Sequence, residues 1–287
     1  MDGRAEAPAA GTVLNALANG KGSAFAIDRY VTAEVSLREG SEGVAGEVAG
    51  RPEADTRLVE RCVELAAAEH GGPDVSLGGT VRTDSEVPMA SGLKSSSAAA
   101  NAAVLATLDA LGAADAVSRE SAALLGVRAA REVGVTVTGA FDDASASMLG
   151  GLTVTDNARD ALLARDEVDW DVLVYTPPER AFSADADVER CERVAPMADH
   201  VAELALAGRY TEAMTVNGLA FCAALSCSSD PLVEAMPLCA GVSLSGTGPS
   251  YVAVGEREGL EAVRDYWDDR PGETWLTTTQ TDGARTT

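Results

Sequence analysis

The densest group of residues that could do chemistry lies in Pro88–Ala100, which reads Pro-Met-Ala-Ser-Gly-Leu-Lys-Ser-Ser-Ser-Ala-Ala-Ala. Small residues let backbone N–H groups approach an anion closely, and a helix that begins here directs the positive end of its dipole at the same point. Serine hydroxyls at such a helix start can cap the helix or bind Mg²⁺. The segment therefore predicts a phosphate site, although a serine-rich cap before an alanine-rich helix would look the same. It is not a P-loop, because G-x-x-x-x-G-K-[ST] occurs nowhere in the chain.

Lysine use points to the same segment. Of 22 basic residues only Lys21 and Lys94 are lysines, and the rest are arginines. Both lysines lie among glycines and serines, in Asn19–Ser23 and Ser91–Ser95. A long, flexible cation beside glycines suits the binding of an anion.

The elements that must position these residues follow an α+β order. Strands are predicted at 31–37, 75–83, 152–155, 170–176, 241–244, 251–254 and 273–279, and helices at 53–70, 96–111, 118–133, 198–207, 210–224, 231–237 and 256–268. Residues 134–143 are predicted to form turns. Because strands and helices do not alternate strictly, a doubly wound parallel sheet is not indicated. The pattern changes after Asp156, so we expect two domains, 1–155 and 156–287.

Charge and composition exclude several classes of protein. The net charge of −23 would repel nucleic acid, and it indicates a salt-rich cytoplasm in which screening relieves self-repulsion. A genome that favours arginine codons is a second explanation for the scarcity of lysine. The sequence has neither a long apolar run nor a secretory signal, so we expect a cytoplasmic protein without membrane contact. Five cysteines without a C-x-x-C pair and two distant histidines offer little for a zinc site or a Ser-His-Asp hydrolase.

Three motifs in order resemble those of the GHMP kinase superfamily. Its phosphate motif, P-x-x-x-G-L-x-S-S-A-A, is similar to the segment from Pro88 to Ala99, with one extra serine and with Ala90 and Lys94 where many members have glycine. The N-terminal segments Ala7–Asn15 and Gly20–Asp28 resemble the first motif, and Leu244–Ser250 resembles the third. Together with Gly139–Ala144, they look most like the archaeal-type shikimate kinases.

The resemblance implies a fold and an activity. It implies the two-domain GHMP kinase fold, with an N-terminal domain like domain 2 of ribosomal protein S5 and a ferredoxin-like C-terminal domain. It also implies ATP-dependent phosphorylation of shikimate to 3-phosphoshikimate, with ATP and Mg²⁺ as cofactors. Another GHMP kinase, for homoserine or mevalonate, and a non-catalytic ligand sensor of the same fold stay open as alternatives. The sequence says nothing about the oligomeric state.

The resemblance also implies roles for individual residues. An aspartate seven residues before a Gly-Gly pair positions the acceptor hydroxyl; Asp143 has this spacing to Gly150, and Asp142 is its rival for the role of base. The remaining implied residues are Lys21 in catalysis; Pro88, Met89, Ala90, Ser91, Gly92, Leu93, Lys94, Ser95, Ser96, Ser97 and Ala98 for the nucleotide; Asn15, Ser23, Asp28, Gly246, Thr247 and Gly248 for the substrate; and Ser96 and Glu132 for Mg²⁺. An arginine should hold the carboxylate of the acceptor, and the sequence leaves Arg29, Arg82, Arg128 and Arg131 open.

Overall fold

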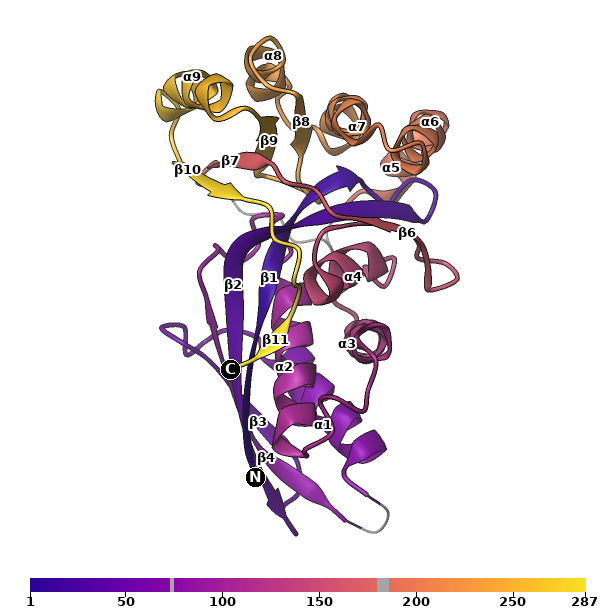
Figure 1. The fold of residues 1–287 in the computed structure, drawn as a ribbon, viewed down its shortest axis with the longest axis vertical. Helices are drawn as coiled ribbons and strands as arrows, with labels where there is room; N and C mark the ends of the chain where they lie inside the picture. The colour runs from indigo at the N-terminus through magenta and orange to yellow at the C-terminus, as the bar shows by residue number, and fades with distance from the viewer. Residues whose placement is uncertain (73–74, 180–185) are drawn as a thin grey trace.

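The computed structural model describes residues 1–72, 75–179 and 186–287. Its first sheet contains seven strands within these residues, in the order β11-β1-β2-β4-β3, with β5 paired to β2 and β6 paired to β5. These strands are β1 (Asp2–Leu14), β2 (Lys21–Glu39), β3 (Val44–Val48), β4 (Leu77–Ser85), β5 (Leu152–Asp156), β6 (Ala161–Asp166) and β11 (Arg285–Thr286). β1 and β2 are long and run along most of the molecule (Figure 1).

Helices lie on one face of this sheet (Figure 1): α1 (Arg57–His70), α2 (Ser95–Ala110) and α4 (Phe141–Leu149) pack against its strands, and α3 (Arg119–Val133) packs on these three helices. The central one, α2, is buried over most of its length. Its alanines allow a close approach to β1: a Cβ on Gly3 would lie 2.1 Å from the carbonyl oxygen of Ala106. Small side chains thus fix the depth at which α2, and the loop before it, sits in the molecule.

The second sheet has the order β10-β7-β9-β8, and its neighbouring strands are all antiparallel. Its elements are β7 (Asp171–Thr176), α5 (Val188–Glu192), α6 (Ala195–Leu206), α7 (Tyr210–Leu225), α8 (Asp230–Ala235), β8 (Gly241–Leu244), β9 (Tyr251–Gly255), α9 (Arg257–Asp268) and β10 (Glu273–Thr278). The helices cover the face of the sheet away from the first sheet (Figure 1). A strand, helices, two strands, helix and strand in this order is the ferredoxin-like arrangement.

The second half of the chain adds strands to the first sheet. β6 continues the first sheet beyond residue 155, and β11 brings the end of the chain back to β1. After β10 the chain also pairs with the middle of β2, where Ile27 bridges Thr279 and the N–H of Gln280 donates to the carbonyl of Ala26. The predicted division near residue 155 falls at the end of β5, whereas the change from one sheet to the other falls between β6 and β7.

The α+β class is confirmed, and each predicted helix and strand is present. Their ends differ by a few residues, except that β2 begins at Lys21, ten residues before the predicted start at residue 31. The prediction does not contain the strands β1, β3, β6 and β11 or the helices α4 and α5. The prediction of turns up to Asp143 is wrong at its end, because α4 already begins at Phe141. None of the helices in the described part of the chain is long and apolar enough to cross a bilayer.

Candidate active site

The loop before α2 has an unusual backbone. Ala90, Gly92 and Lys94 all have positive φ, at 57°, 82° and 63°, and for residues other than glycine this conformation is uncommon and strained. Alternating left-handed residues turn successive N–H groups toward one side, which makes a concave anion site. The start of α2 at Ser95 adds free N–H groups at the same place.

A cavity of about 920 Å³ lies over this loop. Of the residues that the sequence assigned to the nucleotide, Met89, Ala90, Ser91, Gly92, Lys94, Ser95, Ser96 and Ser97 line it. Pro88, Leu93 and Ala98 do not, and Leu93 and Ala98 are fully buried in the core. Leu93 and Ala98 therefore pack into the core beneath the loop and the start of α2, while the lining residues form the wall of the cavity.

The loop between β8 and β9 supports the loop before α2. The Ser245 hydroxyl donates to the carbonyl of Gly92 at 2.8 Å, and the N–H of Ser250 donates to the carbonyl of Ser91 at 3.1 Å. A Cβ on Gly92 would lie 2.1 Å from the carbonyl oxygen of Ser245, so the contact needs glycine. Gly246 and Thr247 line the cavity and Gly248 does not.

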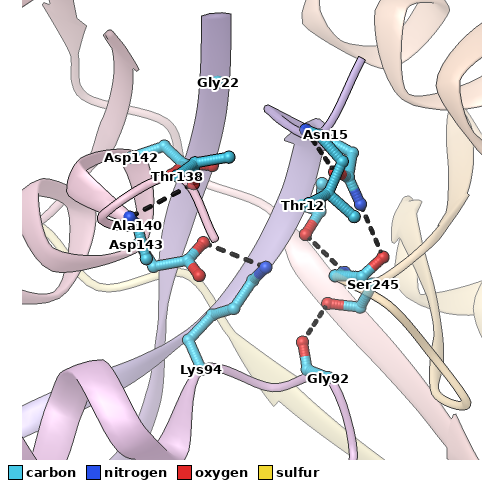
Figure 2. A network of polar contacts seen from close by, with 12 residues as sticks. Thr12, Asn15, Gly22, Gly92, Lys94, Thr138, Ala140, Asp142, Asp143 and Ser245 are labelled. Carbon is cyan, nitrogen blue, oxygen red and sulfur yellow. Dashed lines mark hydrogen bonds and ion pairs between the residues drawn. The ribbon is translucent and has the colours of Figure 1, made fainter. Parts of the chain in front are cut away.

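Asn15, at the end of β1, ties this supporting loop to the first sheet (Figure 2). Its Nδ2 donates to the carbonyl of Gly246 at 2.8 Å, while the N–H of Gly246 donates to the Thr12 hydroxyl at 2.8 Å. Its own N–H donates to Oδ1 of Asn217, a fully buried residue on α7. Asn15 lines the cavity, but its amide is engaged in holding the loop.

The ammonium of Lys94 meets the carboxylate of Asp143 in the cavity. Nζ of Lys94 lies 2.9 Å from Oδ1 of Asp143, and the two side chains are 8% and 17% exposed (Figure 2). Lys94 immediately precedes α2, and Asp143 lies in the first turn of α4, so two helix N-termini point toward the same space. Their positive dipole ends and the Lys94 ammonium together favour the binding of a polyanion beside a carboxylate.

Asp142 faces a different environment from its neighbour. Its Oδ1 accepts from Nδ2 of Asn157 at 2.7 Å, its N–H donates to Oδ1 of Asn157 at 3.1 Å, and the residue is 4% exposed. Its side chain packs on β2, where a Cβ on Gly22 would lie 2.4 Å from Cγ of Asp142. Burial, helped by the charge of Asp143, raises the pKa of Asp142 to about 7. Asp142 therefore anchors the first turn of α4, and Asp143 is the acid that reaches the ion pair in the cavity.

Comparison with known proteins finds relatives that align along all or nearly all of this chain. The family model for the N-terminal domain of GHMP kinases matches residues 57–151. A shikimate kinase of Halobacterium salinarum is 66% identical over 287 residues, which is all of both chains. The chain belongs to the archaeal-type shikimate kinase family, within the GHMP kinases. A second member, from Methanosarcina acetivorans, is 50% identical and is aligned over 93% of this chain and 90% of its own length.

The fold of this GHMP kinase is also seen in solved structures. The mevalonate kinase of Methanococcus jannaschii matches with a TM-score of 0.75 and 14% identity, over 96% of this chain and 98% of its own. This likeness confirms the predicted two-domain fold class. The similarity to a protein of Halobacterium fits the acid-rich, lysine-poor composition of the chain.

Besides Pro88, Leu93, Ala98 and Gly248, four more residues that the family resemblance implied lie outside the cavity. Ser23 is fully buried on β2, next to Gly22, and Lys21 begins the same strand. Asp28 accepts from the Tyr30 hydroxyl at 2.9 Å. The Glu132 carboxylate accepts from Nε of Arg61 at 2.6 Å and Nε of Arg128 at 2.9 Å. None of the four is among the residues that line the cavity in the described part of the kinase.

Sequence reasoning missed several residues that shape the site. Asn157 holds Asp142, Asn217 holds Asn15, and Thr138 accepts from the N–H of Ala140 at the entry to α4. Each is a single polar residue without a motif around it. The only available signal is that an asparagine on the apolar face of a helix, such as Asn217 in α7, needs a buried partner. Among the described residues of this kinase, no three His, Cys, Asp or Glu side chains come together as a metal site.

Proposed function

We propose that the protein transfers the γ-phosphoryl group of ATP to a hydroxyl of shikimate and forms 3-phosphoshikimate, a step of chorismate and aromatic amino-acid biosynthesis. The observation that carries the proposal is the Lys94–Asp143 ion pair in a cavity whose loop and helix start are suited to binding phosphate. The chain is also 66% identical along its whole length to a protein named shikimate kinase. Because the substrates are cytoplasmic metabolites, we expect the enzyme in the cytoplasm.

In this proposal each part of the cavity has a task. The left-handed loop and the N–H groups at the start of α2 bind the phosphates, and Lys94 neutralises the charge that is transferred. Asp143 orients the acceptor hydroxyl and accepts its proton, which leaves late because the transition state of phosphoryl transfer is loose. When ATP binds, Lys94 can exchange part of its contact with Asp143 for phosphate oxygens, which frees the carboxylate for the hydroxyl.

Of the two residues predicted to bind Mg²⁺, only Ser96 lines the cavity. Mg²⁺ keeps several waters and is held by few protein ligands together with substrate phosphates, so the Ser96 hydroxyl, on the cavity wall at the start of α2, fits this requirement. Glu132 does not fit, because its carboxylate is bound by two arginines outside the cavity. Bound Mg²⁺ would neutralise charge on the phosphates of ATP.

The proposal is tested by turnover with a panel of acceptors. Purified protein in about 1 M KCl should release ADP from Mg²⁺–ATP when shikimate is added, and the product should be identified by mass and NMR as the 3-phosphate. Homoserine and mevalonate serve as matched acceptors. Phosphorylation of either of these without phosphorylation of shikimate contradicts the assignment, and binding of shikimate without any turnover would indicate a sensor.

A further inference from the structure

A second cavity adjoins the first. It has a volume of about 570 Å³ and shares Ala16, Leu17, Val137 and Thr138 with the first cavity. Within the described residues, the charged side chains that line it are Arg131 on α3 and Glu192 on α5. A molecule bound in the first cavity can therefore extend into the second and reach one cation there, Arg131.

Arg131 is held close to the loop that leads into α4, the helix that carries Asp143. A Cβ on Gly139 would lie 2.3 Å from Nη2, 2.5 Å from Nε and 2.7 Å from Cζ of Arg131, so only glycine leaves room for the guanidinium. Nη1 and Nη2 contact the carboxylate of Asp160 at 2.7 and 2.6 Å, and Nη2 also donates to the carbonyl of Asn157 at 3.2 Å. These contacts fix the orientation of the guanidinium beside the entry to α4.

Thr138 connects the two cavities. Its Oγ1 accepts from the N–H of Ala140 at 3.2 Å and from Nδ2 of Asn157 at 3.4 Å. Its own hydroxyl proton has no acceptor among the described residues, so it can be donated to a ligand.

We propose that Arg131 and Thr138 bind the carboxylate of the acceptor and thereby select a hydroxy acid over a neutral alcohol. The inference rests on the proposed function, since shikimate is a ring carboxylate with three hydroxyls. With its carboxylate in the second cavity, a hydroxyl on the ring is directed into the first cavity, toward Asp143. A guanidinium and a hydroxyl together give a carboxylate charge-assisted hydrogen bonds at both oxygens.

The Asp160 contact does not prevent this role. The side chains of Arg131 and Asp160 are 42% and 31% exposed, and an ion pair at such exposure contributes little to stability. Asp160 and Asn157 contact only the Nη atoms, and a guanidinium has five N–H groups, so Nε–H remains for a ligand. Asp160 thus holds the guanidinium in place before the acceptor arrives.

The other arginines fit the role less well. Of the four that the sequence leaves open, Arg131 alone lines either cavity in the described structure. Arg128 is bound by Glu132, and Arg29 lies over the Trp275 ring. Arg51 and Arg57 line the first cavity, but on a wall that the second cavity does not share.

The test compares a charged and a neutral acceptor. We expect Arg131→Gln to raise KM for shikimate by about 10- to 100-fold, the range of a lost charge-assisted hydrogen bond, while KM for ATP changes little. With shikimate methyl ester, wild type and Arg131→Gln should have the same kcat/KM. Arg128→Gln, one helical turn earlier, is the matched control and should keep wild-type values. An unchanged KM for shikimate, or an equal loss with acid and ester, overturns the proposal.

Two further variants separate ligand binding from a structural role. Asp160→Asn removes the ion pair and leaves the guanidinium; KM for shikimate should not rise, whereas a purely structural pair would make it rise as in Arg131→Gln. Thr138→Val keeps the shape and removes the donor, so it should raise KM for shikimate and not for the ester. If wild-type protein does not phosphorylate shikimate at all, the proposed function has failed; if it does and the variants behave like wild type, only the carboxylate site is wrong.

Discussion

At the scale of single residues, Lys94 and Asp143 carry the proposed chemistry of the site. Lys94 immediately precedes α2, Asp143 lies in the first turn of α4, and their side chains meet at 2.9 Å. Lys94 takes a left-handed backbone conformation, with a φ of 63°. A lysine in this conformation costs about 1 kcal/mol or more, so the fold must hold it there. The strain places the ammonium between the phosphate loop and the acid.

The first prediction concerns the two neighbouring acids. Asp143→Asn keeps the shape and removes the base, so kcat should fall by about 10²-fold or more while KM for ATP changes little. Asp142→Asn should cost far less, because an amide oxygen can still accept from Asn157. Steady-state kinetics with saturating shikimate measure both variants. A fully active Asp143→Asn together with an inactive Asp142→Asn would reverse the assignment.

The second prediction concerns pH and Asp142. Its pKa is raised from 3.8 to about 7 by burial, so between these values the folded protein keeps a proton that the unfolded chain releases. The contribution of Asp142 to the free energy of unfolding is therefore present at low pH and is lost as pH rises to 7, by roughly 1.4 kcal/mol per pKa unit. Denaturant unfolding of wild type and Asp142→Asn at pH 5 and pH 8 measures it. Relative to the variant, wild type should lose stability at pH 8; parallel curves would contradict the raised pKa.

Much of the site could be predicted at this scale, because its residues lie in contiguous motifs. The phosphate loop and Asp143 follow from local spacing. Ser23 did not reach the cavity because side chains alternate along a strand: Gly22 faces Asp142, so its neighbour faces the other side. Asn157 and Asn217 could not be predicted, because their partners are 15 and 202 residues away in the chain.

At the scale of elements, the site depends on how loops dock on one another. Most of the helices and strands could be predicted from periodicity, since each carries its own pattern, whereas β1, β3, β6, β11, α4 and α5 could not. The pairing of β11 with β1 could not be predicted, because register between distant segments leaves no trace in a single strand. The same holds for the contact of Gly92 with Ser245, which joins two loops from the two halves of the chain.

The third prediction tests that contact. Gly92→Ala would place a Cβ 2.1 Å from the carbonyl oxygen of Ser245, so the two loops must separate and the phosphate-binding N–H groups lose their alignment. We expect KM for ATP to rise by at least 10-fold. Gly112→Ala is the control: its φ is also positive, at 67°, but nothing lies within 4 Å of the added Cβ. It should cost about 1 kcal/mol of stability and leave KM for ATP unchanged; equal effects of both variants on KM would show that loop docking is not the cause.

At the scale of the whole molecule, the charge of −23 opposes the binding of two anionic substrates. Attraction must therefore be local, from Lys94, helix N-termini and backbone N–H groups, which act at contact distance and are screened little by salt. The site gathers these groups where the two halves of the chain meet. A strongly acidic protein can thus bind ATP, provided that its own surface charges are screened.

The last prediction follows from this screening. The Debye length is about 30 Å at 0.01 M salt, about 10 Å at 0.1 M and about 3 Å at 1 M, so in dilute buffer the acidic groups repel one another across the whole molecule. We expect the melting temperature and the kinase activity to fall steeply below a few hundred millimolar KCl. NaCl at equal ionic strength should restore both, because screening depends on ionic strength and not on the identity of the ion. Circular dichroism melts and ADP release along the same salt series measure the two quantities together. Full activity and an unchanged melting temperature in dilute buffer would show that the acidity is no adaptation to salt, and recovery in KCl but not in NaCl would point to specific binding of potassium instead of screening.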